Sequence, residues 1–86
     1  MFYITQEMRD ASHLFLLVLL PPEAHGSSFS WGWSHDPDRS TPFGTLGMAQ
    51  RVRNLALEQK YWSRAAYDCT RIVGQDEASI IQVMQS

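Results

Sequence analysis

The stretch SFSWGWSHDPD, residues 28–38, ends in side chains suited to acid–base or metal chemistry. His35 and Asp36 could serve a small hydrolase or ligate a metal, with His25 approaching them. Structural zinc requires four nitrogen or sulfur ligands at characteristic spacings, and no C-x-x-C or H-E-x-x-H motif is present. Pro37 presets φ, and aspartate side chains accept from nearby backbone N–H groups. The pattern therefore predicts a turn and no metal site, while the hydrolase stays a third hypothesis.

The cysteine and the adjacent carboxylates of the sequence also do not predict a catalytic site. Cys69 is the only cysteine, so no internal disulfide can form. It falls within an expected strand beside Asp68, whose charge disfavours a thiolate, and we expect Cys69 to be a packed hydrophobic residue. Asp76 and Glu77 are adjacent and are expected to be solvated charges in a turn. Neither G-x-G-x-x-G nor G-x-x-x-x-G-K occurs, so no catalytic residue and no cofactor is predicted.

Composition indicates one globular domain, residues 1–86. The chain is 44% hydrophobic and 19% charged, with a net charge of -2 that disfavours general binding of nucleic acid. The apolar run Leu14–Leu20 is too short to cross a bilayer, which takes roughly 20 residues. Glu7, Arg9 and Asp10 precede this run without a positive excess, which disfavours a signal peptide. We expect a cytoplasmic protein with no membrane partner.

The periodicity of apolar residues predicts an α+β fold. Alternation at 2–9 and 29–34 indicates half-buried strands, and the continuous apolar run at 14–20 indicates a central strand covered on both faces. A helix from Leu46 to about Trp62 is expected, with Thr45 as its N-cap. Residues 67–73 and 79–84 are rich in β-branched residues and predict a closing hairpin. The expected fold is a two-layer sandwich of order β-β-β-α-β-β, with one helix on a mostly antiparallel sheet of four or five strands.

Residues 33–50, WSHDPDRSTPFGTLGMAQ, resemble a pattern of small proteins from phages and mobile elements, including anti-CRISPR proteins. A D-P turn follows a strand, Phe43 and Thr45 form an F-x-T cap, and the small residue Ala49 faces the sheet. The segments 71–74 and 80–81, R-I-V-G and I-I, resemble the closing hairpin of such proteins. The resemblance covers roughly half the chain. It implies a non-enzymatic protein that binds and inhibits a host machine.

The expected helix also offers a surface for a partner. Leu57 and Tyr61 fall opposite the core-facing stripe, with Arg53 and Lys60 beside them, which gives an apolar centre with a basic edge. We therefore predict a protein-binding protein that acts by occluding a host protein or protein complex, or that pairs with its own copy. Its expected contacts are Leu57, Tyr61, Arg53 and Lys60 on the helix, and His35, Asp36, Asp38, Asp76 and Glu77 on loops at the sheet ends.

A small nucleic-acid-binding domain is the alternative function. It would use the basic residues at positions 51, 53, 60, 64 and 71, and bases would stack on Trp31 or Trp33. This hypothesis predicts an affinity for oligonucleotides that falls steeply with salt.

Overall fold

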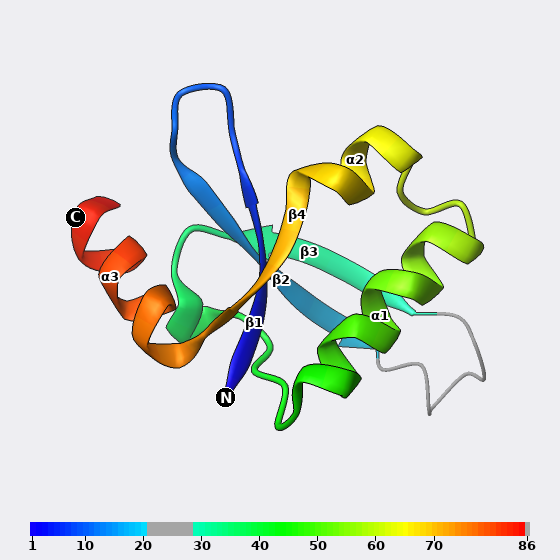
Figure 1. Ribbon diagram of the computed structural model, residues 1–86, viewed down its shortest axis with the longest axis horizontal. Helices are drawn as coiled ribbons and strands as arrows, with labels where there is room; N and C mark the ends of the chain where they lie inside the picture. Colours follow the sequence, from blue (N-terminus) through cyan, green and yellow to red (C-terminus); the bar gives the residue numbers. More distant parts are fainter. Residues whose placement is uncertain (21–28, 86) are drawn as a thin grey trace.

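Four antiparallel strands form the centre of the molecule. The computed structural model describes residues 1–20 and 29–85, and the expected loop around His25 lies outside them. The spatial order of the strands is β3-β2-β1-β4 (Figure 1). Their bounds are Phe2–Glu7 for β1, His13–Leu20 for β2, Ser30–Ser34 for β3 and Thr70–Gly74 for β4.

The central position of the apolar run is confirmed. β2 lies between β1 and β3, and its residues Phe15 and Leu16 are both fully buried in different core clusters. Successive side chains of a strand point to opposite faces, so a strand covered on both faces needs apolar residues at consecutive positions. Both faces are covered at Phe15 and Leu16, whereas Leu19 near the end of β2 is 61% exposed, so burial explains the apolar sequence only in the middle of the strand.

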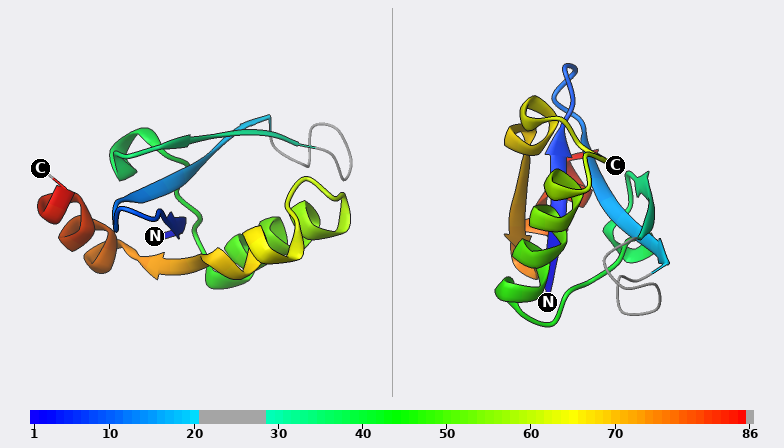
Figure 2. Two further views of the ribbon diagram at one scale, coloured as in Figure 1. Left: turned by 90° about the horizontal axis from the view of Figure 1, so that it is seen from above. Right: turned by 90° about the vertical axis from the view of Figure 1, so that its right-hand side faces the viewer.

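Helices cover both faces of the sheet. Helix α1 (Leu46–Glu58) and the short α2 (Arg64–Cys69) pack on the face that contains Ile4 and Leu16. Helix α3 (Gln75–Gln85) packs on the opposite face. Figures 1 and 2 show α3 at one end of the sheet, away from α1 and α2. The α3 cluster is small and consists of Tyr3, Phe15, Val73, Ala78 and Ile81.

Helix α1 begins where the sequence predicts. The Thr45 hydroxyl accepts a hydrogen bond from the Met48 N–H at 3.1 Å, and Phe43 just upstream is buried. Ala49 and Ala56 are fully buried against the sheet, since small side chains let the helix approach it closely. The predicted N-cap is therefore confirmed.

The predicted closing hairpin is wrong, although the α+β class and the four-stranded antiparallel sheet are confirmed. Residues 67–69 belong to α2 and residues 79–84 to α3, so the order is β-β-β-α-α-β-α, with three α-helices in the described residues. Ser63 caps α2 by accepting from the Ala66 N–H. Acidic residues occupy the first turn of α3, where the helix dipole favours negative charge, and Ala78 and Ile81 have helical spacing on its buried face. These signals prevail over the β-branched composition.

The end of α1 explains another difference from the sequence prediction. Helix α1 stops at Glu58 in a Schellman motif, in which the Tyr61 N–H bonds to the Ala56 carbonyl at 2.9 Å and the Lys60 N–H to the Leu57 carbonyl at 3.1 Å. Lys60 has a φ of 61°, the left-handed conformation that usually takes glycine at this position. The chain therefore turns before Trp62, and the expected helix is one turn too long.

Lys60→Gly is expected to raise the free energy of unfolding by about 0.5–1 kcal/mol, because glycine adopts this conformation without the steric cost of a Cβ. Urea unfolding followed by tryptophan fluorescence measures the change. Lys60→Ala is the control, because it removes the charge and keeps the Cβ, and it is expected to leave stability nearly unchanged. An equal gain from both substitutions would contradict the conformational explanation.

Candidate protein-binding surface

The outer face of α3 carries three large apolar side chains in contact with solvent. Ile80, Val83 and Met84 are 59%, 74% and 77% exposed. Their spacing places them one turn apart on one side of the helix, away from the buried Ala78 and Ile81. We call Ile80, Val83 and Met84 the α3 strip. A shallow hollow lies along the strip, lined by these three residues and Ser79.

The α3 strip differs from the scattered exposed apolar residues of an ordinary surface. An amphipathic surface helix keeps polar residues on its outer face, whereas a helix that is apolar on both sides is usually packed on both sides. The C-terminal half of α3 is apolar on both sides, but only its inner side meets the sheet. The strip is therefore a surface suited to a second contact.

A larger cleft continues from the strip toward the β1–β2 turn. Its volume is about 580 Å³, within the range of ligand-binding pockets. Ile81 and Met84 form its apolar part, and Met84 belongs to the strip as well. The turn at residues 9–12 projects beyond the sheet in Figure 1. The described residues that line it are Asp10, Ala11, Ser12, His13, His35, Ile81, Met84 and Gln85.

Polar side chains fix the end of α3 against this cleft. The Gln85 carboxamide accepts from the His13 N–H and donates to the His35 carbonyl at 3.2 Å. The Gln82 carboxamide donates to Asp36 Oδ1 at 2.9 Å. The His35 Nδ1 lies 3.1 Å from the His13 carbonyl, to which it donates. Helix α3 is thus tied to the ends of β2 and β3, and the cleft has a defined shape.

Asp10 supplies a negative charge at the rim of the cleft. Its Oδ1 accepts from the Ser12 hydroxyl at 2.6 Å and from the Ser12 N–H at 3.0 Å. These two bonds hold the pKa of Asp10 below its ordinary value, the hydroxyl having the larger effect. The carboxylate is therefore ionised at neutral pH.

Ser12, His35 and Asp10 of the cleft are not arranged as a Ser-His-Asp triad. In a Ser-His-Asp arrangement the imidazole lies between the hydroxyl and the carboxylate and accepts the hydroxyl proton. Here the Ser12 hydroxyl donates directly to Asp10, and the His35 Nδ1 is engaged by a backbone carbonyl.

Asp36 and Asp38 form the turn that the sequence predicts. Asp36 Oδ1 accepts from the Asp38 N–H at 2.9 Å, and Pro37 begins a short 3-10 helix, Pro37–Arg39. Asp36 also accepts from Gln82 on α3, so this carboxylate is held by the fold. Asp38 and His35 remain exposed, and His35 lines the cleft.

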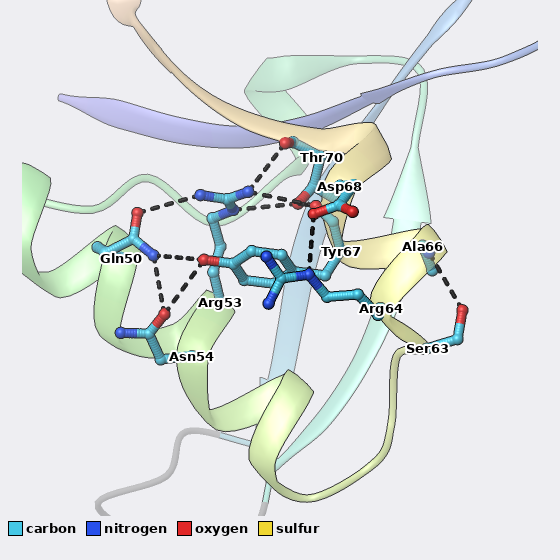
Figure 3. Close-up of polar contacts among 9 residues, drawn as sticks. All are labelled: Gln50, Arg53, Asn54, Ser63, Arg64, Ala66, Tyr67, Asp68 and Thr70. Atoms are coloured by element: carbon cyan, nitrogen blue, oxygen red, sulfur yellow. Dashed lines mark hydrogen bonds and ion pairs between the residues drawn. The ribbon is translucent and has the colours of Figure 1, made fainter.

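Arg53 holds α1 to the junction of α2 and β4. Its Nε donates to Thr70 Oγ1 at 3.0 Å, and its Nη2 donates to the carbonyls of Thr70 and Tyr67 at 2.9 and 3.2 Å. Its Nη1 donates to Gln50 Oε1 at 3.1 Å, and the guanidinium lies 4.2 Å from the Tyr67 ring centroid (Figure 3). These internal contacts occupy the donors that sequence analysis assigned to a partner.

The other helix residues predicted as contacts are also separated from the α3 strip. Leu57 is half-buried, and Tyr61 stacks on Trp31 with ring centroids 4.6 Å apart. The expectation that Tyr61 faces outward is wrong, because α1 ends before it and the left-handed turn at Lys60 directs the chain back to the sheet. Lys60 itself is exposed. The α1 residues lie at the opposite end of the sheet from α3 (Figure 1).

Asp76 and Glu77 lie in the first turn of α3, which is a correction of the expected hairpin turn. Both are exposed, and Glu77 forms an ion pair with Arg71. Arg64 pairs with Asp68 at 3.2 Å and Arg39 with Asp36 at 3.9 Å. Arg64 and Arg71, two of the five basic residues considered for nucleic-acid binding, thus have acidic partners, and Arg53 is held by internal hydrogen bonds, which weakens the case for a nucleic-acid surface.

The expectation that Cys69 is packed is wrong. Cys69 is the last residue of α2, and its side chain is exposed. The described residues contain no cluster of three or more His, Cys, Asp or Glu arranged to hold a metal ion. Nor does any helix within 1–20 and 29–85 combine the length and apolar character that a membrane span requires.

The α3 strip was not predicted, because the composition of residues 79–84 is typical of a strand. The i, i+3 and i+4 spacing of the strip residues, together with the acidic first turn of α3, was the signal that could have found them. Of the predicted contacts, the fold brings His35 and Asp36 next to the C-terminal half of α3. No family model, curated protein or solved structure matches the chain.

Proposed function

We propose that this is a non-enzymatic protein-binding protein that acts by covering a surface of a host protein or protein complex. The single observation that carries the proposal is the α3 strip, which presents three large apolar side chains on the outside of a helix already packed on its inner side. The role of an inhibitor, implied by the resemblance to phage proteins, is part of this proposal.

The size of the strip indicates how a partner would be engaged. Stable protein interfaces bury about 1,200–2,000 Å² in total, which three side chains alone do not supply. The neighbouring cleft adds the exposed rim around Asp10 and His35 to the apolar centre. An apolar centre with a polar rim is the usual anatomy of an interface. We infer that Val83 and Met84 lie near the centre of the contact.

The double variant Ile80→Gln, Val83→Gln is expected to weaken capture of the partner from host lysate by tenfold or more, while the free energy of unfolding changes by less than about 0.5 kcal/mol. Quantitative pull-down at several bait concentrations measures the affinity. The matched control is Leu46→Gln, Met48→Gln, which makes the same kind of change on the exposed start of α1.

Undiminished capture by the α3 variant would overturn this choice of surface. Analytical ultracentrifugation of the purified protein tests whether a second copy of the chain binds to the α3 strip. A wild-type dimer that the α3 substitutions convert to a monomer would assign the strip to self-association and refute the host-partner proposal.

A further inference from the structure

All three tryptophans of the chain meet at one cavity, at the other end of the sheet from the α3 strip. Trp31 and Trp33 come from β3, and Trp62 comes from the connection between α1 and α2. The cavity has a volume of about 250 Å³. Within residues 1–20 and 29–85, it is lined by Gln6, Trp31, Trp33, Tyr61, Trp62, Ala66 and Thr70.

The aromatic rings around this cavity are arranged as two tilted pairs. Trp31 and Tyr61 have ring centroids 4.6 Å apart with an angle of 32° between their planes. Trp33 and Trp62 have centroids 5.7 Å apart with an angle of 30°. Trp31, Trp33 and Tyr61 are only half-buried, so part of each ring remains accessible. Aromatic walls of this kind favour flat, polarisable ligands.

Two polar groups in the cavity wall are without hydrogen bonds in the described part of the chain. Trp62 is 6% exposed, and its buried Nε1–H has no partner there. The Gln6 carboxamide also makes no hydrogen bond to residues 1–20 or 29–85. A buried donor without a partner is unfavourable, so a ligand acceptor that meets it gains affinity. Nε1 is covered, so a ligand that bonds to it must displace a neighbouring ring.

The charges near the cavity select the ligand further. None of the described residues that line it is Lys, Arg, Asp or Glu, so a charged ligand would find no counter-ion among them. Arg53 lies directly behind the wall, with its Nε 3.0 Å from Thr70 Oγ1. This fixed positive charge disfavours a quaternary ammonium ligand, which aromatic walls otherwise attract.

We propose that this cavity binds a neutral planar heteroaromatic ring of nucleobase size. A ring acceptor would take the Trp62 Nε1–H, the Gln6 carboxamide would bond to an edge group, and the ring would lie against the tryptophans. The volume is below the roughly 300–1,000 Å³ of pockets for larger ligands, which limits the occupant to one ring system. The proposal is independent of the protein-binding function, because the α3 strip contributes nothing to this cavity.

Titration with adenosine, followed by the three indole N–H signals in ¹H–¹⁵N spectra, tests the proposal. We expect saturable binding with a dissociation constant of about 1 mM or tighter, and a downfield shift of the Trp62 indole proton as it gains an acceptor. Trp62→Phe and Gln6→Leu are each expected to weaken binding by about five- to tenfold. Tyr67→Phe changes a ring outside the cavity and is expected to bind as wild type does.

A short oligodeoxyadenosine distinguishes a free ring compound from a base in a strand. If the oligonucleotide shifts the same indole signal and binds more tightly than adenosine, the natural ligand is a base within a strand. If it binds equally or more weakly, the natural ligand is a free ring compound. Both results agree with a ring-binding site. Two results would overturn the proposal. One is no shift of any indole signal at about 10 mM adenosine, which corresponds to a negligible affinity. The other is saturable binding of tetramethylammonium without binding of adenosine.

Discussion

Arg53→Met is expected to lower the free energy of unfolding by about 2–3 kcal/mol, because it removes charged donors from carbonyls that the fold covers. The guanidinium joins α1 to the Tyr67 and Thr70 carbonyls, and Thr70 is buried. Methionine keeps the apolar stem that packs along the helix but removes the guanidinium donor from the Thr70 carbonyl. The Tyr67 carbonyl loses one donor and keeps those of Thr70, the N–H and the hydroxyl. Urea unfolding with an unchanged m-value measures the loss.

Two further variants separate the geometry of Arg53 from its charge. Arg53→Lys keeps the charge but cannot donate to Gln50, Tyr67 and Thr70 from one fixed plane, and it is expected to recover less than half of the loss. Arg51→Met makes the same change at an exposed position of α1 and is expected to stay within about 0.5 kcal/mol of wild type. An Arg53→Met protein as stable as the Arg51→Met control would show that the network adds nothing.

The role of Arg53 shows what a helical wheel leaves out. The wheel places Arg53 near the outer face of α1, which is correct for an isolated helix. It does not include α2, whose residue Tyr67 packs against the guanidinium and supplies a carbonyl acceptor. The contact joins residues 14 or more apart in sequence, and no local pattern encodes it. Sequence reasoning therefore assigned a structural side chain to a binding surface.

The predictable elements are those with a strong local signal. Thr45 caps α1 as expected, and the alternation of Phe29, Trp31 and Trp33 places all three rings toward the α1 core. The segment 79–84 carries both β-branched residues and helical spacing, and its environment decides between them. Val73 and Phe15 on the open face of the sheet need an apolar cover, which a helix at 75–85 supplies through Ala78 and Ile81.

The candidate surfaces were predictable only in part. The residue types at Asp36 and Pro37 predict the turn. They do not predict that the turn lies beside α3, because that position depends on the hydrogen bond from Gln82. The gathering of Trp31, Trp33 and Trp62 was likewise hidden, because Trp62 reaches the cavity only through the left-handed turn at Lys60.

Phe15 is expected to control the docking of α3 more than the rest of the fold. It is fully buried in the five-residue cluster under α3 and makes an edge contact with Tyr3, with ring centroids 6.1 Å apart. Phe15→Ala is expected to cost about 3–5 kcal/mol. A chain of this length has about 4–13 kcal/mol of stability, so the substitution comes close to unfolding the protein. Thermal unfolding measures this loss.

Phe15→Leu shows which helix depends on this side chain. It is expected to lower the free energy of unfolding by about 1–2 kcal/mol while the protein stays folded. Leu16→Val has a similar expected cost but lies in the other cluster, under α1. Hydrogen exchange of the α3 amides should rise most in Phe15→Leu, and that of the α1 amides most in Leu16→Val, because each helix rests on its own cluster. Equal effects on both helices would contradict this. Because the α3 strip depends on a docked helix, Phe15→Leu should also weaken partner capture without altering any exposed residue.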